Sequence, residues 1–194
     1  MDPRSLCDAL TARFPTAVIA SHLFRGEATV TISKEYLREV AEALKEDPAF
    51  QMGFLMDLTA VDYLTFAKEP PATGAFVNYG MPVRPPSQIP DPDPWPGPAA
   101  AARFEVVGHF YSLSRRHRLR LKIPVEESEP EVDSLADLWA SADWFEREVW
   151  DMFGIRFKGH PHLKRILLYE EFAGYPLRKD YPVNKRQPLI GPVN

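Results

Sequence analysis

The chain has 194 residues, 45% of them hydrophobic, which suits one sizeable core or at most two small ones. It contains 20 prolines and a single cysteine, Cys7, which excludes an internal disulfide framework, a cysteine zinc site and an iron–sulfur cluster held by this chain alone. The net charge of −4 divides into −9 for residues 1–155 and +5 for residues 156–194, so an acidic domain followed by a basic tail is predicted.

The N-terminal region predicts a short helix and a hairpin. Asp2 can cap a helix that has Pro3 at its first position and stops before Pro15. Residues 17–24 and 28–33 flank a short turn, and valine and isoleucine alternate with threonine in the second run. This alternation is typical of a hairpin with one buried face.

The clearest predicted helix follows Ser33, which is expected to cap it. Apolar residues recur there at helical spacing until Asp47 and Pro48 end the pattern: Leu37, Val40, Ala41 and Leu44. Residues 50–58 then form a run apolar enough for a buried strand.

Half of the prolines lie in residues 70–98. Such a segment can neither pair in a sheet nor continue a helix, so residues 68–102 are predicted to be an exposed loop insertion of mostly extended conformation. A proline-rich docking ligand is the functional alternative, but most stretches of this kind are spacers.

Two strands and two helices are predicted after the insertion. Residues 104–111 and 118–123 are the strands, the second with three apolar side chains facing the core, three basic side chains facing outward and Pro124 at its end. Residues 135–139 carry the apolar face of a first helix, and Asp143 is expected to cap a second helix that ends at Gly154.

These elements predict an α+β fold in which a mixed β-sheet has helices packed on one face. The domain is expected to span residues 1–155, interrupted by the insertion at 68–102. Residues 156–194 show no periodicity and are predicted to be an extended basic tail for subunit assembly.

The second of these helices carries most of the candidate chemistry. Arg147 and Asp151 are four residues apart and are expected to pair on its surface. Glu146 and Glu148 do not suit an acid–base pair, because residues two apart on a helix point to different faces. His160 and His162 are an incomplete metal set without a nearby cysteine. We therefore predict no catalytic, cofactor-binding or metal-binding residues in this chain.

The tail interleaves basic and aromatic residues, a composition that also occurs on nucleic-acid contact surfaces. The chain as a whole is acidic, and it contains no known nucleic-acid motif. A protein partner that offers acidic patches and sites for aromatic anchors is therefore the favoured interpretation.

A series of closely spaced motifs covers the last third of the chain. In order they are Glu146-Arg147-Glu148, Asp151-Met152-Phe153-Gly154-Ile155, Gly159-His160-Pro161, Leu163, Arg165-Ile166-Leu167-Leu168 and Pro176-Leu177-Arg178-Lys179-Asp180-Tyr181-Pro182. This series resembles the signature of the 30-kilodalton subunit family of respiratory complex I, which is the C subunit of the bacterial NADH-quinone oxidoreductase. Two features depart from the family pattern, namely the length of the Pro-rich stretch and the glycine at position 108.

The resemblance implies a non-catalytic structural subunit of the peripheral arm. Such a subunit supports electron transfer from NADH to quinone through FMN and iron–sulfur clusters held by partner subunits, coupled to proton translocation. The implied partners are the large quinone-site subunit, the 49-kilodalton subunit homologue, and adjacent iron–sulfur subunits, with no nucleic acid. The signature residues are expected to have structural and partner-interface roles: Glu146, Arg147, Glu148, Asp151, Gly154, His160, Pro161, Arg165, Pro176, Arg178, Lys179, Asp180 and Tyr181.

The chain has no apolar run of the length that a transmembrane helix needs, and its first residues lack the features of a secretion signal. A peripheral location on the cytoplasmic side of the bacterial inner membrane is therefore expected. The equivalent subunit of a related membrane-bound hydrogenase-type complex, a self-contained enzyme and a nucleic-acid binder remain as alternatives.

Overall fold

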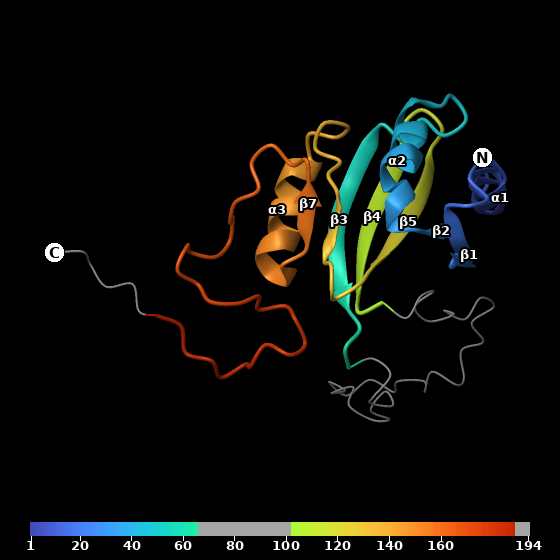
Figure 1. The fold of residues 1–194 in the computed structure, drawn as a ribbon. Coiled ribbons are helices and arrows are strands. Elements are labelled where there is room, and N and C mark those ends of the chain that lie inside the picture. The colour runs from blue at the N-terminus through green and yellow to red at the C-terminus, as the bar shows by residue number, and fades with distance from the viewer. Residues whose placement is uncertain (66–101, 189–194) are drawn as a thin grey trace, which may run out of the picture.

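The computed structural model describes residues 1–65 and 102–188 (Figure 1). The prediction of an exposed, extended insertion therefore falls outside the described residues except at Ala102, which is buried.

Five strands form one mixed sheet in the order β1-β2-β5-β4-β3. Their bounds are Val18–Phe24 for β1, Glu27–Ile32 for β2, Phe54–Asp62 for β3, Phe104–Ser112 for β4 and His117–Val125 for β5. β2 and β5 run parallel, while the other neighbouring pairs are antiparallel. The predicted hairpin is confirmed as β1 and β2, and the predicted strands on either side of the 113–116 turn are confirmed as β4 and β5.

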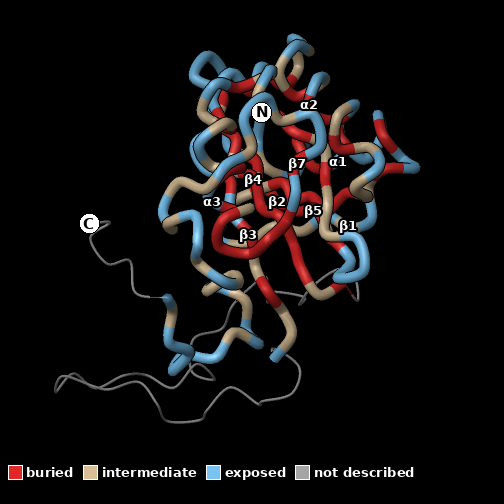
Figure 2. Tube along the Cα trace, turned by 60° about the vertical axis from the view of Figure 1, so that its left-hand side comes forward, coloured by how far each residue is buried: buried red, intermediate tan, exposed pale blue. Residues whose placement is uncertain are grey.

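Helices α1 (Pro3–Arg13) and α2 (Leu37–Glu46) lie against one face of this sheet, which confirms the predicted α+β class (Figure 1). The Asp2 carboxylate caps α1 by accepting the Ser5 N–H at 3.0 Å, as expected. Helix α3 (Ala142–Phe153) packs beside the edge strand β3. Figure 2 shows the buried residues concentrated in the interior of the molecule, whereas the edge strand β1 contains none.

The interior position of β2 overturns the prediction of a hairpin with one buried face. Because β2 pairs with β5 on its second side, Thr29 and Thr31 are buried as well as the apolar residues between them. Arg120 donates to the Thr29 hydroxyl at 3.2 Å. Lys122, expected to face outward, is also buried, where its Nζ contacts Glu105 at 2.6 Å.

Two boundaries differ from the prediction. The Ser33 hydroxyl contacts Glu35 instead of capping the helix, because a 3₁₀ turn, Lys34–Tyr36, precedes α2. The strand expected at 50–58 begins at Phe54, because the backbone turns at Gln51, which has φ of 50°. The apolar residues before it are buried as loop residues, and the Met52 N–H donates to the Leu44 carbonyl at 2.8 Å.

The helix predicted at residues 135–139 is a single turn. The Trp139 N–H donates to the Leu135 carbonyl at 2.9 Å, so the apolar spacing that suggested a helix is satisfied by one turn. Both side chains are buried, and the Trp139 indole donates to the Met52 carbonyl at 3.0 Å. The Trp139 ring also packs against Phe110, which occupies the space that a side chain at Gly108 would need.

Two further differences concern the surroundings of α3. The helix begins after Ser141, so Asp143 lies in its first turn and is not the cap. The strands β6 (Glu131–Asp133) and β7 (Arg156–Lys158), which precede and follow α3 in the chain, form a short parallel pair that the sequence did not predict. In the described part of the chain, no helix has the length and apolarity required to cross a membrane.

Candidate subunit interface

Residues 159–188 form neither helix nor strand, and none of them is buried as a whole residue (Figure 2). They follow α3, loop below it in the view of Figure 1 and reach the end of β3. Most of the predicted signature residues are found in this segment or on α3. The segment has no backbone ladder of its own and is held by contacts with α3 and with the ends of β3 and β4.

Asp151 is the centre of the first contact. Its fully buried carboxylate accepts the backbone N–H groups of Ile166, Leu167 and Leu168 at 3.1, 2.9 and 2.9 Å and pairs with the Arg165 guanidinium at 2.7 Å. Burial raises the pKa of Asp151, but these donors outweigh it and the net pKa lies below its ordinary value. The charged carboxylate therefore fixes three successive residues of an irregular segment.

Arg147 makes the complementary contact, which corrects the predicted surface pair with Asp151. Its guanidinium is buried and donates to the carbonyl oxygens of Lys164 and Arg165 at 3.1 and 3.2 Å, and it lies over the Trp144 ring. One turn of α3 thus binds the carbonyl groups of the tail and the next turn binds its N–H groups. Spacing along the helix alone could not reveal this, because both partners come from a segment without periodicity.

Glu146 does not contact the tail but the residues that precede α3 in the chain. It is fully buried and accepts the Ser134 hydroxyl and the Leu135 N–H, both at 2.6 Å. Burial is the largest influence and raises the pKa of Glu146 to about 7 despite these hydrogen bonds. Glu148 is exposed, so the two glutamates do occupy different faces, as predicted.

Gly154 ends α3 in the left-handed conformation, with φ of 72°, as the C-terminal residue of a helix often does. A Cβ atom there would lie 2.5 Å from the Tyr175 ring, so the glycine also makes room for the returning tail. Arg178 lies between the rings of Tyr175 and Phe104, at 4.7 and 5.1 Å from their centroids, and donates to the Phe153 carbonyl.

The second contact lies at the end of β3. The Lys179 N–H donates to the Asp62 carboxylate at 2.9 Å, and Asp180 pairs with Arg103 at 2.7 Å. Arg103 also forms two bonds with Asp62, of 2.9 and 3.2 Å, and an ion pair with Glu127. The sequence pattern assigned no role to Asp62 or Arg103. The one feature of the sequence that could have pointed to them is their position, because they lie at the two strand ends that flank the insertion.

The remaining signature residues have local roles. The His160 side chain is buried and its Nε2 lies 3.1 Å from the Asp143 carbonyl, while its Nδ1 accepts the His162 N–H at 2.9 Å. The neighbouring Pro161 is exposed and Pro176 is partly buried. Tyr181 stacks on Phe172, with ring centroids 6.1 Å apart.

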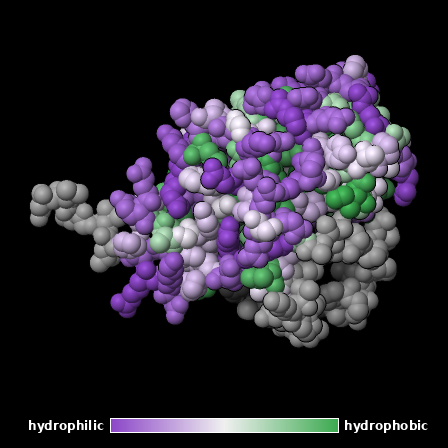
Figure 3. All heavy atoms as spheres, in the orientation of Figure 1, coloured by the Kyte–Doolittle hydropathy of each residue, from purple (hydrophilic) through white to green (hydrophobic). Residues whose placement is uncertain are grey.

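The outer surface of this region combines apolar and basic side chains. Trp144, Leu167 and Leu177 are 59%, 63% and 49% exposed. Exposed cations follow the same segment: Arg156, Lys158, Lys164, Lys179, Lys185 and Arg186. Figure 3 shows hydrophilic residues dominating this side of the molecule, with apolar residues between them.

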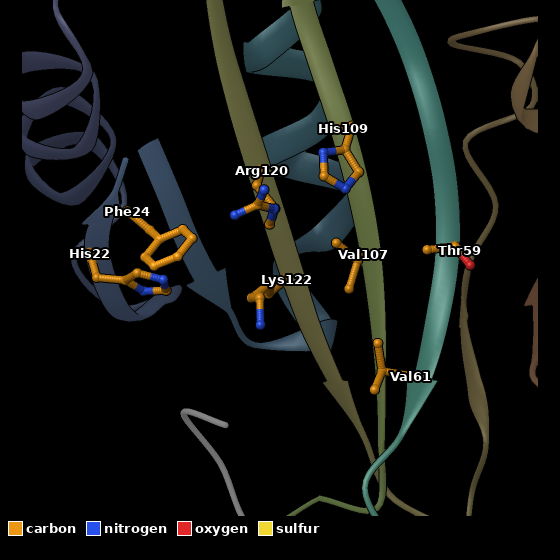
Figure 4. A pocket seen from close by; sticks show the side chains of 8 residues that line it. All are labelled: His22, Phe24, Thr59, Val61, Val107, His109, Arg120 and Lys122. Carbon is orange, nitrogen blue, oxygen red and sulfur yellow. The ribbon is translucent and has the colours of Figure 1, made fainter. Parts of the chain in front are cut away.

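The described residues contain no cluster of three or more His, Cys, Asp or Glu side chains that could hold a metal ion. A hollow of about 380 Å³ lies on the sheet face opposite α2, lined by residues that include Phe24, Val107 and Arg120 (Figure 4). None of the signature residues lines it, so the hollow and the α3–tail region are separate features.

Comparison with known proteins connects this arrangement to a family. Residues 30–187 match the model of the family described as respiratory-chain NADH dehydrogenase, 30 Kd subunit. The chain belongs to this family. The resemblance inferred from the signature motifs is thus confirmed.

Relatives of the 30-kilodalton subunit family match nearly the full length. The C subunit of the NADH-quinone oxidoreductase of Citrifermentans bemidjiense is 40% identical over 94% of this chain and 92% of its own. The corresponding C subunits of a Roseiflexus species and of Coxiella burnetii are 37% and 39% identical, over 96% and 99% of this chain and 88% and 81% of their own.

Solved structures agree with the fold. A trypsin-resistant fragment of Nqo5 is 26% identical, with a TM-score of 0.57 over 84% of this chain and 100% of its own. A chain of the archaeal membrane-bound sulfane sulfur reductase has a TM-score of 0.62 over 93% of this chain and 86% of its own, but at 19% identity it shows the fold alone.

Proposed function

We propose that this chain is a non-catalytic structural subunit of the peripheral arm of NADH-quinone oxidoreductase. In this role it supports electron transfer from NADH, through FMN and iron–sulfur centres of partner subunits, to quinone, coupled to proton translocation. The observation that carries the proposal is what the family signature residues do: Asp151 and Arg147 of α3 bind the backbone of the tail, and Asp180 of the tail pairs with Arg103.

A scaffold role suits this use of the signature. Charged side chains that are buried in contacts with backbone groups fix a shape, and they are not available to a substrate. Exposed apolar and cationic residues stand beside them, among them Trp144, Leu167 and Lys164. Interfaces between subunits favour aromatic anchors and complementary charge, so the partner surface is expected to be acidic at its rim.

The proposal assigns separate tasks to separate segments. Residues 1–155 form the α+β domain and residues 156–194 carry the assembly surface, while the insertion at 68–102 is not needed for the core. The partners are the large quinone-site subunit and the adjacent iron–sulfur subunits, on the cytoplasmic side of the inner membrane.

Deleting residues 174–194 tests this assignment. The truncated chain keeps the sheet and α3, so it should fold, but it should no longer co-purify with the other subunits from solubilised membranes. Mass spectrometry of the material purified with the full-length and the truncated chain measures the result. Co-purification of the truncated chain at the level of the full chain would contradict the assembly role of the tail.

The same measurement separates the alternative proposal, a hydrogenase-type membrane complex. Flavin-bearing and NADH-oxidising subunits should accompany the full-length chain if it belongs to an NADH-quinone oxidoreductase. A set of partners that contains a hydrogenase-type catalytic subunit instead would favour the alternative.

A further inference from the structure

The two strand ends that flank the insertion are joined by one buried ion pair. Asp62 ends β3 and Arg103 precedes β4, and their side chains are 0% and 7% exposed. The Arg103 guanidinium meets both carboxylate oxygens of Asp62, and the Tyr63 N–H donates to the Arg103 carbonyl at 2.8 Å. Two parallel bonds of this kind hold a guanidinium and a carboxylate in one orientation.

This pair leaves binding capacity that the tail uses. A carboxylate accepts several hydrogen bonds and a guanidinium has five donors. The free capacity of Asp62 is taken by the Lys179 N–H, at 2.9 Å, and that of Arg103 by Asp180, at 2.7 Å, together with Glu127. Asp62 and Lys179 are 117 residues apart in the sequence, so the contact is a tertiary one.

We infer that Asp62 and Arg103 form a docking site for Lys179 and Asp180 of the tail and thereby position Leu177 and Lys179 for a partner subunit. Asp62 and Arg103 are positioning residues, because the side chains offered to the partner belong to Leu177 and Lys179 of the tail. Leu177 is 49% exposed although its N–H is held by the Met152 carbonyl at 3.1 Å, and the side chain of Lys179 is exposed although its N–H is held by Asp62. The role in partner binding rests on the proposed function; the docking itself does not.

The carboxyl groups of Asp62 and Asp180 both favour the charged form, which strengthens their contacts with Arg103. Burial raises the pKa of Asp62, but Arg103 and the N–H groups of Lys179 and Leu64 outweigh it and keep the carboxyl charged. The hydrogen bond from Arg103 lowers the pKa of Asp180. Removing the charge of Asp180 leaves Arg103 paired with Asp62, so a variant at Asp180 weakens the docking of the tail without breaking the link between the strand ends.

Asp180→Asn in the full-length chain tests the docking site. We expect the Lys179 amide to exchange with deuterium about tenfold faster, because the neighbouring ion pair between Asp180 and Arg103 is lost and the bond to Asp62 alone then ties this amide to the docking site. The amides of residues 166–168, which Asp151 holds, should exchange at the wild-type rate and so provide an internal control. Asp137→Asn removes a different exposed ion pair, with Arg38, and should leave the Lys179 amide unchanged.

The effect of the docking site on partner binding is measured as the amount of the other subunits that co-purify with tagged chains from membranes. Asp180→Asn should lower this amount about fivefold or more, and Arg103→Lys should lower it as well, because an ammonium group cannot reproduce the two-pronged contact. Unchanged exchange at Lys179 would overturn the docking site. Faster exchange with wild-type co-purification would overturn the positioning role. If the wild-type chain brought down no other subunit, the proposed function would fail, and the exchange measurement would still decide the docking site.

Discussion

Three buried carboxylates, Asp151, Asp62 and Glu146, differ in charge state because their hydrogen-bond donors differ. Asp151 and Asp62 each meet a guanidinium as well as backbone N–H groups, and both pKa values lie below the ordinary value. Glu146 meets only a hydroxyl and one N–H, with Asp143 and Asp137 adding to the negative charge nearby, so burial raises its pKa to about 7. A buried carboxylate that lacks a cation costs stability when it ionises.

The predicted consequence is that the contribution of Glu146 to stability falls as pH rises from about 4.5 to 7. In this range the folded chain keeps the Glu146 proton that the unfolded chain has released, so unfolding becomes easier as pH increases. Glu146→Gln removes this proton exchange, and its amide can still donate to Ser134 and accept from Leu135. Relative to the wild type, the variant should gain on the order of 2–3 kcal/mol in the free energy of unfolding between pH 5 and pH 8.

Chemical denaturation at several pH values measures this difference. The partly buried His109 and the buried His117, whose pKa values are lowered by burial, titrate in both proteins and cancel from the comparison. A difference between variant and wild type that stays constant from pH 5 to pH 8 would mean that Glu146 titrates at its ordinary pKa.

At the scale of elements, the end of α3 decides where the tail can lie. Gly154 closes the helix with its N–H on the Trp150 carbonyl at 2.8 Å, and Tyr175 occupies the space where a side chain would stand. The short β6–β7 pair brings the chain back beside the entry to α3. Helix, turn and tail therefore form one packed unit, although only the helix has regular secondary structure.

Gly154→Ala should be more harmful than an equivalent change nearby. Gly159 also has a positive φ, of 82°, but a Cβ atom there would meet nothing within 4 Å. Alanine at either position costs about 1–2 kcal/mol through the left-handed backbone. At Gly154 the displacement of Tyr175 adds a further loss, which we expect to be about 1–3 kcal/mol, as for other overpacked sites. Urea denaturation of both variants measures the difference, and equal losses would refute the tight contact with Tyr175.

At the scale of the whole molecule, charge separates the domain from the tail. Residues 156–194 carry a net charge of +5 and residues 1–155 a net charge of −9. Some of the tail cations are engaged within the chain, as Arg165 is with Asp151, but others, such as Lys164 and Arg186, are exposed. These exposed cations suit an acidic rim on the proposed partner.

Neutralising Lys164 and Arg186 to glutamine should therefore weaken assembly without affecting the fold. We expect the subunit to leave solubilised membrane complexes at a salt concentration about twofold lower than the wild type, because exposed charge pairs are screened. Salt titration followed by gel filtration measures this. Neutralising two exposed arginines of the domain, Arg4 and Arg115, is the matched control. Dissociation of both double variants at the same salt concentration would argue against a tail-specific contact.

Local patterns in the sequence were sufficient for much of the fold. The Asp2 cap, the helical spacing around Val40, the alternation around Leu121 and the glycine after α3 each depend on residues within a few positions of one another, and α1, α2, α3, β4 and β5 follow from such local patterns. The misplaced strand start at Phe54 and the single turn at residues 135–139 have the opposite cause. There the apolar pattern reports burial correctly, and contacts with distant residues decide the backbone conformation.

The sequence by itself determined the α+β class, the charge of the tail and, through its motifs, the family. Only the tertiary structure decided what the signature residues do. Arg147 and Asp151 are four apart on one helix and were expected to pair with each other, yet each binds the tail, and Asp62 and Arg103 gained a role only when the tail was seen beside them. The physical reason is that hydrogen bonds to the backbone of an irregular segment leave no periodic trace in the sequence.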